Sequence, residues 1–526
     1  MVRRFLPLVL LVGACAPDIK QNPPPSPTVT AQLDLAATPP VVPLPNDLAI
    51  AGGKVAVPTS PGDSPAQTEL NQDYLGSLNG FPFESTAQAF FSGPLDPATV
   101  VPQNIVVLDI TPGTVPTQVT GLPAPVFDKA SNAINQQPPA AGWTRAHRYA
   151  VALIAGPGRL TGANGEPVIG SPTWALVSSP NPLVSCQSEA GGLPDLMSPC
   201  TPAVDVIPST YTDPAARLAD QTKTAIQLET IRRGYAPLVA QVVALAHLPD
   251  ASSIPIVWTF TIVDAGEVTF DPAHGVIPFP NDVLRSTSGQ VALPNPGTQA
   301  PLTASDCATA TDSATQLVCG LNTLDGFSTI AAPISENGAA NYAVAQARLD
   351  PTVNLLATGS VGLIRLASSA PTPEQTPPPV YTPCVNCLSS PHTDGTPQTS
   401  PQQLQWQLNV PLDEKTTYLA YVTTGLKDDS GKPVVPTPAF ALVRSKKPIA
   451  MNGKSQVNVL TDAQAVQLEA LRAALAPALD GLEAGGVCAR ASRSRGRSPP
   501  NRKPRSSTRS MHTWGRRRFR PCRKAP

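Results

Sequence analysis

The sequence predicts a mainly β protein made of two tandem β-sandwich modules, each with an added helical segment, and a disordered C-terminal tail. Three observations predict this fold: a long colinear duplication, a high proline content, and short runs of β-branched and aromatic residues between turn signals. The 526 residues are enough for two to four domains of ~100–200 residues each. We therefore expect whole domains to be repeated.

The two copies of the duplicated unit keep the same order of short motifs. Residues 43–48, Pro-Leu-Pro-Asn-Asp-Leu, return as Pro-Phe-Pro-Asn-Asp-Val at 278–283. Further pairs of matching segments follow in the same order: 55–58 with 291–294, 78–81 with 324–327, 95–97 with 349–351, and 227–229 with 467–469. A period of ~20–50 residues would indicate a solenoid, so this period of roughly 240 indicates duplicated domains. We interpret the repeated Pro-Asn-Asp segment as a structural turn, because Asn and Asp side chains can bond their own backbone.

Composition favours strands over helices. The chain contains 64 prolines, over twice the usual share of ~5%. Proline breaks helix interiors and is confined to edges and turns in sheets. Aromatic residues make up only 5% of the chain. We therefore expect short strands, long proline-rich loops, and cores built from Val, Leu, Ile and Ala.

Five segments have the β-branched and aromatic content of strands. They are residues 104–110, 149–154, 254–262, 361–366 and 416–422. The strands at 149–154 and 416–422 are each followed by an Asn-Gly-type or Asp-Ser-Gly turn with proline soon after. A strand followed by such a turn is typical of a β-sandwich.

Each module also has a helical segment. The first spans residues 213–247, and we expect a break near Gly234 and Pro237 because proline removes a helix hydrogen bond. The second spans residues 461–482 and begins at a cap offered by Thr461 and Asp462. Its expected apolar face consists of Val466, Leu468, Leu471 and Leu475.

Residues 1–14 predict a bacterial lipoprotein signal peptide. A basic start precedes an apolar segment from Phe5 to Val12, which is too short to span a membrane. The sequence Val-Gly-Ala-Cys at 12–15 resembles the lipobox, in which the cysteine becomes the lipidated N-terminus. A plain secretory signal is the alternative. We favour lipidation of Cys15, because the basic start, the apolar length and the small residues all agree with it.

The signal peptide predicts the cellular location, and the remaining segments predict the order of the domains. Residues 15–30 would form a flexible stalk, and the lipid anchor makes the membrane the expected partner, with the outer membrane of the cell envelope as the location. The first module would span residues 31–265, the second, incomplete module 266–487, and the disordered tail 488–526. No other stretch approaches ~20 uninterrupted apolar residues.

Six cysteines fall in three close pairs that predict disulfides. The pairs are Cys186 with Cys200, Cys307 with Cys319, and Cys384 with Cys387, and each lies in a Ser/Pro/Thr/Asp-rich stretch that resembles a loop. In an exported protein, even and local pairing indicates disulfides. The alternative for the last pair is a redox or zinc motif, but zinc would need further ligands at suitable spacing and only His392 is near.

The formal net charge of zero hides an acidic body and a basic tail. Residues 488–526 hold 14 of the 37 Lys and Arg residues and no acidic residue, which leaves 23 basic against 37 acidic residues in the body. Nothing in the acidic body suggests nucleic-acid binding. The tail is either a genuine basic segment that binds anionic lipid or nucleic acid, or the product of a frameshift. We favour the frameshift, because the first module has a Trp-Thr-Phe strand at the corresponding place.

Several segments resemble a known bacterial family. Residues 270–282, residues 324–329, residues 467–472 and the Trp-Thr-Phe-Thr run at 258–261 are similar to the N-terminal domain of bacterial virulence-factor lipases. The Leu-Asp-Pro-Ala-Thr-Val segment at 95–100 and residues 418–433 are similar to bacterial Ig-like domains of the S-layer type. The resemblance covers most of residues 30–487 and implies Ig-like sandwiches. In that lipase family a hydrolase domain follows, whereas none follows here.

The sequence offers no recognisable catalytic or cofactor site. It lacks a Gly-x-Ser-x-Gly elbow and any phosphate-binding glycine loop. No histidine has a readable Ser/Asp partner set, so a solvated or structural role is expected for all five: His147, His247, His274, His392 and His512. Asp428 and Asp429 could bind calcium but lack EF-hand spacing, so a solvated turn is expected.

These observations predict a non-enzymatic envelope lipoprotein with no cofactor and no metal. Its duplicated modules would serve adhesion, ligand binding or surface scaffolding, with a protein or glycan partner of unknown identity. The alternative is the non-catalytic N-terminal portion of a secreted lipase or esterase, truncated by a frameshift before its hydrolase domain.

Overall fold

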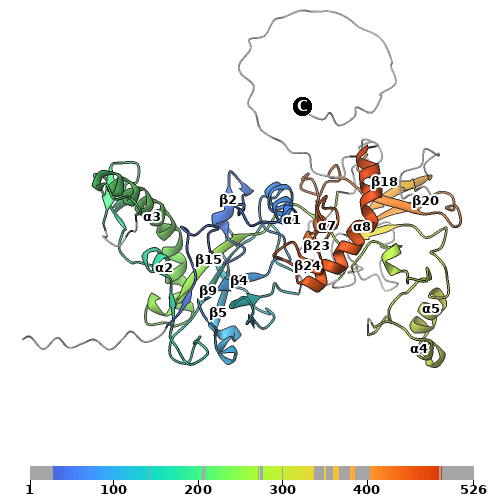
Figure 1. Ribbon diagram of the computed structural model, residues 1–526, viewed down its shortest axis with the longest axis horizontal. Coiled ribbons are helices and arrows are strands. Elements are labelled where there is room, and N and C mark those ends of the chain that lie inside the picture. Colours follow the sequence, from blue (N-terminus) through green and yellow to red (C-terminus); the bar gives the residue numbers. More distant parts are fainter. Residues whose placement is uncertain are drawn as a thin grey trace, which may run out of the picture.

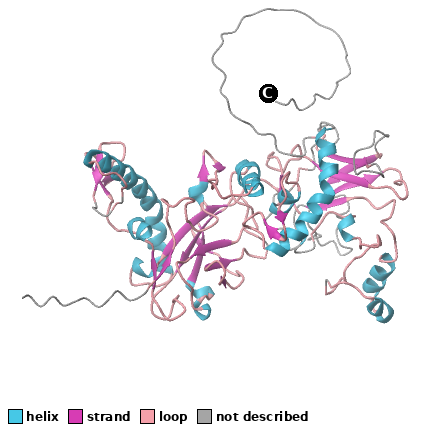
Figure 2. Ribbon diagram, in the orientation of Figure 1, coloured by secondary structure: helices cyan, strands magenta, loops and turns pink. Residues whose placement is uncertain are grey.

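The computed structural model describes residues 28–140, 142–203, 207, 209–270, 272, 276–298, 300–336, 349–350, 359–366, 379–385, 403–484 and 487. The predictions made for the signal peptide, for Cys15, for Cys387 and for the tail at 488–526 lie outside these residues. Within them, many short strands form small open sheets and helices are fewer, which confirms the mainly β class (Figures 1 and 2).

The first half of the chain contains two main sheets. One has the strand order β15 (Ile256–Thr261), β9 (Arg148–Leu153), β5 (Ile105–Asp109), β6 (Thr117–Gln118), and the other β4 (Ala87–Phe90), β8 (Ala133–Gln136), β7 (Val126–Asp128). Four small pairs accompany them: β1 (Val29–Ala31) with β10 (Val168–Gly170), β2 (Ile50–Ala51) with β3 (Lys54–Val55), β11 (Val184–Cys186) with β14 (Cys200–Pro202), and β12 (Glu189–Ala190) with β13 (Leu193–Pro194).

The second half has smaller sheets. One has the strand order β17 (Ile334–Glu336), β20 (Gln403–Leu408), β19 (Tyr381–Val385). The others are pairs: β18 (Val361–Arg365) with β21 (Tyr418–Val422), β16 (Glu267–Val268) with β22 (Val435–Pro436), and β23 (Ala450–Met451) with β24 (Lys454–Ser455). The α-helices are α1 (Pro65–Glu69), α2 (Pro172–Val177), α3 (Pro214–Leu245), α4 (Ala304–Thr309), α5 (Ser313–Leu321), α7 (Pro438–Val443) and α8 (Asp462–Ala484). All five strands expected from the sequence form, as β5, β9, β15, β18 and β21.

The strand orders of the two halves correspond. β4-β8-β7 has the same order as β17-β20-β19, and the parallel pair β1–β10 has its counterpart in β16–β22. The register is also kept: Asp109 of β5 lies opposite Tyr149 of β9, and Arg365 of β18 lies opposite Tyr418 of β21. The sequence repeat is therefore matched by a repeat of strand pairing.

The halves differ at one sheet edge. In the first half, β9 lies between β5 and β15 and is buried along nearly its whole length, with Val151 at 0% exposure. In the second half, β21 pairs only with β18 among the described strands, and Ala420, which stands where Val151 does, is exposed. The second half thus has no described counterpart of β15.

The repeated Pro-Asn-Asp segment is a turn in both halves, as predicted. Asn46 Oδ1 accepts a hydrogen bond from Leu48 N, and Asn281 Oδ1 accepts one from Val283 N, each at 3.0 Å. Each asparagine caps a short 3-10 helix and satisfies one of its exposed N–H groups. The following aspartates differ, because Asp47 bonds Arg148 and Thr259, whereas Asp282 lies 3.5 Å from Arg285, three residues on.

The prediction of a break in the first helix is wrong. α3 runs unbroken from Pro214 to Leu245 with Pro237 inside it. Proline removes one hydrogen bond, but Tyr235, Val239 and Val242 around it are buried in the core. Tertiary packing of this face therefore outweighs the local cost of proline.

The second helix begins where the sequence predicts, and Leu468, Leu471 and Leu475 of its expected apolar face are partly buried, whereas Val466 is not. Thr461 Oγ1 accepts from Gln464 N at 3.3 Å while the Gln464 side chain accepts from Thr461 N at 3.0 Å. This reciprocal pair is a capping box. Ala465 is buried, whereas Val466 is exposed. The expectation for Val466 was wrong, because the residue that α8 buries at this point is the neighbouring Ala465.

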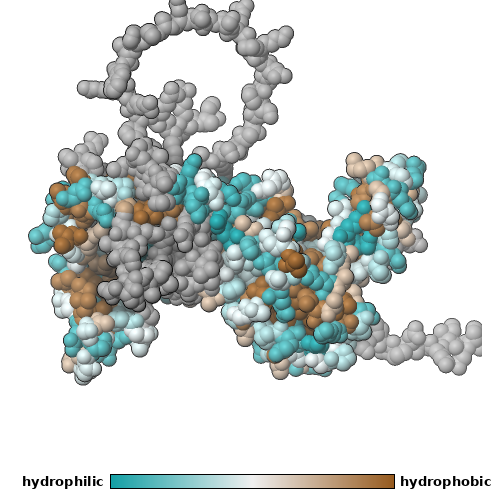
Figure 3. All heavy atoms as spheres, turned by 180° about the vertical axis from the view of Figure 1, so that it is seen from behind, coloured by the Kyte–Doolittle hydropathy of each residue, from teal (hydrophilic) through white to brown (hydrophobic). Residues whose placement is uncertain are grey.

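The main core belongs to the first half and continues into the second. Its buried residues include Leu153, Trp174 and Phe260 from the first half together with Leu442 of α7 and Ile449 before β23. A smaller core of the second half contains Leu363, Trp406 and Leu426, among others. In Figure 1, α7, β23, β24 and α8 lie between the first-half sheets and the strands β18 and β20. Figure 3 shows apolar side chains on both halves in separate patches among polar ones.

A matched pair of glycine substitutions tests the difference between the halves. A Cβ added at Gly80 would lie 2.6 Å from Ile262 C and Val263 N, directly after β15, whereas nothing lies within 4 Å of a Cβ at Gly326. We expect Gly80→Ala to lower the free energy of unfolding by about 1–3 kcal/mol through overpacking against backbone. Gly326→Ala should leave it unchanged or slightly higher. Urea unfolding of both variants checks this, and equal effects would contradict it.

Candidate functional site at the contact between the two halves

The two halves meet where α1 and the turns after it face α7. Ser64 caps α1 by accepting from Gln67 N at 3.0 Å, and Pro65 follows at the first helical position, which its fixed φ suits. The α1 helix continues as η2 (Leu70–Tyr74), whose Tyr74 Oη donates to Pro436 O at 3.0 Å. The sequence thus fixes helical turns of one half against the start of α7 in the other.

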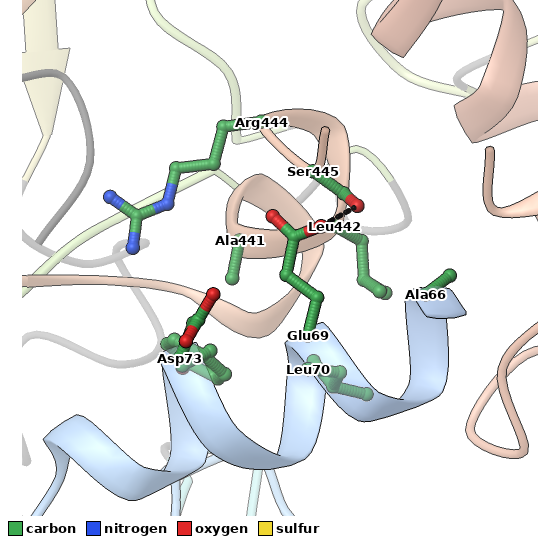
Figure 4. Close-up of a pocket in the computed structure, with 9 residues that line it drawn as sticks. Ala66, Glu69, Leu70, Asp73, Ala441, Leu442, Arg444 and Ser445 are labelled. Carbon is green, nitrogen blue, oxygen red and sulfur yellow. Dashed lines mark hydrogen bonds between the residues drawn. The ribbon is translucent and has the colours of Figure 1, made fainter. Parts of the chain in front are cut away.

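A small cavity lies at this contact (Figure 4). Its volume is about 50 Å³, and its lining combines the apolar and the charged residues of both helices: Ala66, Glu69, Leu70, Asp73, Tyr74, Ala441, Leu442, Arg444 and Ser445. Sites for drug-sized ligands are clefts of ~300–1,000 Å³. A cavity of this size therefore suits a few water molecules and not an organic substrate.

Charged groups in the cavity wall join the halves. Glu69 accepts hydrogen bonds from Ser445 Oγ at 3.0 Å and from Lys446 N at 3.1 Å. The Arg444 side chain leaves the end of α7 on the side of the cavity where Asp73 lies, whereas Glu69 points toward Ser445 (Figure 4). Burial lowers the pKa of Arg444, while the charges of Tyr74, Glu69 and Asp73 act in the opposite direction. The hydrogen bonds of Glu69 hold the residues that follow α7 against α1.

A buried carboxyl group lies close to the same contact. Glu267 of β16 is fully buried, and its Oε1 accepts from Phe83 N at 3.3 Å. Burial, followed by the negative charge of Glu84, raises the pKa of Glu267 well above its ordinary value. Burial and the same two carboxylates also raise the pKa of Tyr74. The site therefore favours the protonated form of Glu267.

Replacing Glu267 should change the pH dependence of stability with a defined sign. Because the pKa is raised in the folded protein, the unfolded chain releases this proton first, so the free energy of unfolding falls as pH rises above the ordinary value of 4.5. Glu267→Gln removes this titration. We expect the variant to be more stable than the parent at pH 8 and to match it at pH 4. Denaturant unfolding at both pH values checks this, and a difference independent of pH would contradict it.

The turn after β21 is a second junction between the halves and corrects the expected solvated turn. Asp428 is fully buried, and its Oδ1 accepts from Ser430 N and Lys432 N, both at 2.9 Å. Its Oδ2 accepts from Gly266 N at 3.2 Å and lies 3.7 Å from Arg145 Nη1. Arg145 of the first half and three backbone N–H groups of the second half already occupy the carboxylate, so the structure gives it a joining role and not that of an open calcium ligand.

Among the histidines, His147 has a defined partner. Its Nδ1 lies 2.6 Å from Asp109 Oδ2 on the neighbouring strand. Burial acts to raise the pKa of Asp109, but hydrogen bonds from Thr111 and His147 outweigh it, and the net pKa is lowered. The pair joins the ends of β5 and β9, which fits the structural role expected for His147. His247 ends the α3 segment with a positive φ of 51°, whereas His274, His392 and His512 lie outside the described residues.

The structure contains disulfides at two of the three predicted pairs. Cys186 and Cys200 lie opposite each other in β11 and β14, and Cys307 of α4 is joined to Cys319 of α5. Cys384 is also disulfide-bonded, but its expected partner Cys387 is not described. The expected loop setting was wrong, because these cysteines lie on short strands or helices. Each disulfide therefore fixes two elements too short to be stable alone.

The sequence motifs did not lead us to predict a glutamate–arginine ion pair that occurs in both halves, although its motif is visible in the sequence. Glu229 of α3 is fully buried; its carboxylate accepts from Arg232 Nε at 2.7 Å and from Leu183 N at 2.9 Å. Glu469 of α8 accepts from Arg472 Nε at 2.8 Å and from Ile449 N at 2.8 Å. The signal was the repeated Gln-Leu-Glu-x-x-Arg, which anchors each helix to the backbone that follows the preceding α-helix, α2 or α7.

In the part of the chain that the structure describes, no cluster of three or more His, Cys, Asp or Glu side chains could hold a metal ion. Nor does any described helix combine the length and hydrophobicity that crossing a bilayer requires.

Comparisons with known proteins give only remote similarities. No protein-family profile and no curated protein matches the chain. The N-terminal part of the bacterial S-layer protein SbsC is 16% identical over 16% of this chain and 18% of that one, with a TM-score of 0.13. The S-layer protein rSbsC(31–844) is 11% identical over 68% of this chain and 53%, about half, of that one, also with a TM-score of 0.13. Scores this low carry no argument about fold or function.

Proposed function

We propose that the protein is a non-enzymatic cell-envelope lipoprotein whose two Ig-like modules serve adhesion, ligand binding or surface scaffolding. The observation that carries the proposal is the repeated strand pairing in the two halves, combined with the lipobox-like segment that ends at Cys15. Two sandwich modules in tandem on a lipid anchor would hold a protein surface away from the membrane, where a partner could bind it. The contact between the halves, made of buried side chains and ion pairs, suits a stiff display element.

A tyrosine feature supports the Ig-like assignment of both modules. Tyr149 Oη accepts from Thr144 N, and Tyr418 Oη accepts from Asp413 N, each at 3.0 Å and five residues upstream. Such a tyrosine corner, in which the hydroxyl bonds the backbone a few residues before it, is a hallmark of Ig-like sandwiches. Its presence in both halves supports two modules of one kind.

The polar groups of the described cavity support a non-enzymatic role. Catalysis of ester hydrolysis requires a nucleophile, a base and oxyanion donors converging on a substrate-sized space. The cavity of about 50 Å³ lies between α1 and α7, and Glu69 bonds Ser445 and Lys446 across the contact. We therefore expect the purified chain not to hydrolyse short-chain nitrophenyl esters, and turnover that survives stringent purification would contradict the proposal.

The second candidate is the non-catalytic N-terminal portion of a secreted lipase or esterase. The open edge of β21 favours it, because a strand corresponding to β15 would follow α8 in an uninterrupted module. Sequencing the downstream DNA separates the candidates. A hydrolase frame with a Gly-x-Ser-x-Gly elbow would select the second one.

The lipid anchor has its own test. We expect mass spectrometry of a membrane fraction to find a diacylated Cys15 at the mature N-terminus, and we expect Cys15→Ser to release the protein from the membrane. Cys488→Ser is the control, because Cys488 lies outside the signal. An unmodified N-terminus, or a Cys15→Ser variant that stays in the membrane fraction like the parent, would refute the anchor.

A further inference from the structure

The open edge of β21 presents a full set of backbone groups. Thr423 N donates to Ser360 O of the strand segment on one side. In an antiparallel pair, alternate residues bond the same neighbour, so the N–H groups of Tyr418, Ala420 and Val422 face away from β18. No described strand pairs with them.

The corresponding edge of the first half is occupied. Ile262 N donates to His147 O, and by the same alternation Ile256, Trp258 and Phe260 of β15 face β9. The three β9 residues opposite them correspond to Tyr418, Ala420 and Val422, since both strands keep the same register on β5 and β18. The register of an added strand on β21 is therefore defined by its sister module.

Two residues of the second half independently mark the position in which no counterpart of β15 is described. Asp47 is 15% exposed and bonds Thr259 of β15, whereas the side chain of its counterpart Asp282 is 62% exposed. Gly80 packs against the backbone after β15, whereas its counterpart Gly326 faces open space. Both differences fit the same observation, that no strand described in the second half takes the position of β15.

The edge also lacks the usual protection against pairing. Natural edge strands carry charges, proline or bulges that prevent the addition of another strand. The sequence of β21 is Tyr-Leu-Ala-Tyr-Val, with no charge and no proline. Unprotected edges of this kind are the acceptors in β-strand addition, where backbone bonds give affinity and alternate side chains give specificity.

We infer that β21 is an acceptor for an extended segment of a partner polypeptide, which adds as an antiparallel strand in the register that β15 takes on β9. The partner segment is apolar, with β-branched or aromatic side chains in the pattern of Ile256–Thr261, because that strand fits the equivalent edge. The inference deepens the proposed binding role and rests on the correspondence of the two modules.

The probe is a synthetic acetylated peptide of residues 254–262, Ile-Pro-Ile-Val-Trp-Thr-Phe-Thr-Ile, titrated into the full chain by fluorescence anisotropy. We expect saturable binding. N-methylation at Trp258 of the peptide removes an N–H that faces β21 and should weaken binding at least tenfold. N-methylation at Thr259 alters an N–H that faces away and should change it less than twofold. These peptides leave the protein itself unchanged.

Matched protein variants give the reciprocal test. Ala420→Pro removes an N–H on the open edge without touching the bonds to β18 and should weaken binding at least tenfold, whereas Ala420→Ser keeps the N–H and should bind like the parent. Lack of binding, or equal binding of the two N-methyl peptides, would overturn the inference. Dimerisation through β21 that excludes the peptide would identify a second copy as the occupant and also overturn it. Neither result would affect the lipid-anchor test at Cys15.

Discussion

Glu229→Gln is expected to destabilise the first half strongly, by about 3–5 kcal/mol, because it leaves buried arginine charge without its partner. Glu229 is fully buried and accepts bonds from Arg232, Arg233 and Leu183 N. Burial alone would raise its pKa, but the arginine hydrogen bonds outweigh burial and lower the pKa of Glu229 to about 2. The charged form is therefore strongly preferred in the folded state.

Glu469→Gln is the matched control for this prediction. The same pair of bonds, to Arg472 and to Ile449 N, anchors α8, but the side chain of Glu469 is 22% exposed. Water can solvate the arginine that the substitution leaves behind, so we expect a smaller cost of about 1–2 kcal/mol. Amide exchange within α3 and α8 measures each effect locally, which avoids assuming that two coupled halves unfold in one step.

The pH dependence of the Glu229 contribution has the usual sign for a carboxylate with a lowered pKa. The stabilisation is complete above the ordinary value of 4.5 and is lost as pH falls toward about 2. The difference between Glu229→Gln and the parent should therefore shrink as pH is lowered from 7 to 3. Equal costs for Glu229→Gln and Glu469→Gln, or a difference that does not depend on pH, would contradict the assignment of a buried ionic anchor.

Much of the fold could be predicted from local sequence because its strands and turns carry local signals. The runs that form β5, β9, β15, β18 and β21 are rich in β-branched or aromatic residues, and both asparagines of the Pro-Asn-Asp segments cap turns through their own backbone. The unbroken α3 was not predictable in this way. Pro237 signals a break locally, and only the packing of Tyr235 and Val239 in the core overrides it.

The contact between the halves could not be predicted from the sequence for a related reason. Asp428 lies in a run of Asp, Ser and Gly that is typical of a solvated turn, yet Arg145 of the first half and Gly266, the residue before β16, contact its carboxylate. These partners are separated from it by more than 160 residues, so no local pattern could indicate burial. The cavity at Glu69 and Arg444 is non-local in the same sense, because α1 and α7 meet only in the folded chain.

Adding a third strand to the β18–β21 sheet within the same chain should have the second large effect, an increase in the local stability of β21. We expect a graft of residues 246–263 after Ala484 to place a copy of β15 on β21, because α3 leads into β15 through the same connection in the first half. Trp258, Phe260 and Ile256 would each bury apolar surface, at ~1.5–3 kcal/mol for a fully buried side chain. The ordering of the added residues offsets much of this gain.

The clearest measure of the graft is local hydrogen exchange along β21. The amides of Tyr418, Ala420 and Val422 face the open edge, and bonding them to a new strand should slow their exchange by about 100-fold, which corresponds to roughly 2.7 kcal/mol of added protection. The same graft with Trp258→Pro lacks an N–H that must reach β21 and should leave these amides as fast as in the parent. The amides of Leu419 and Tyr421 already face β18 and should change less in both grafts. Protection that appears equally in the proline graft would mean that nonspecific burial, and not strand pairing, covers the edge.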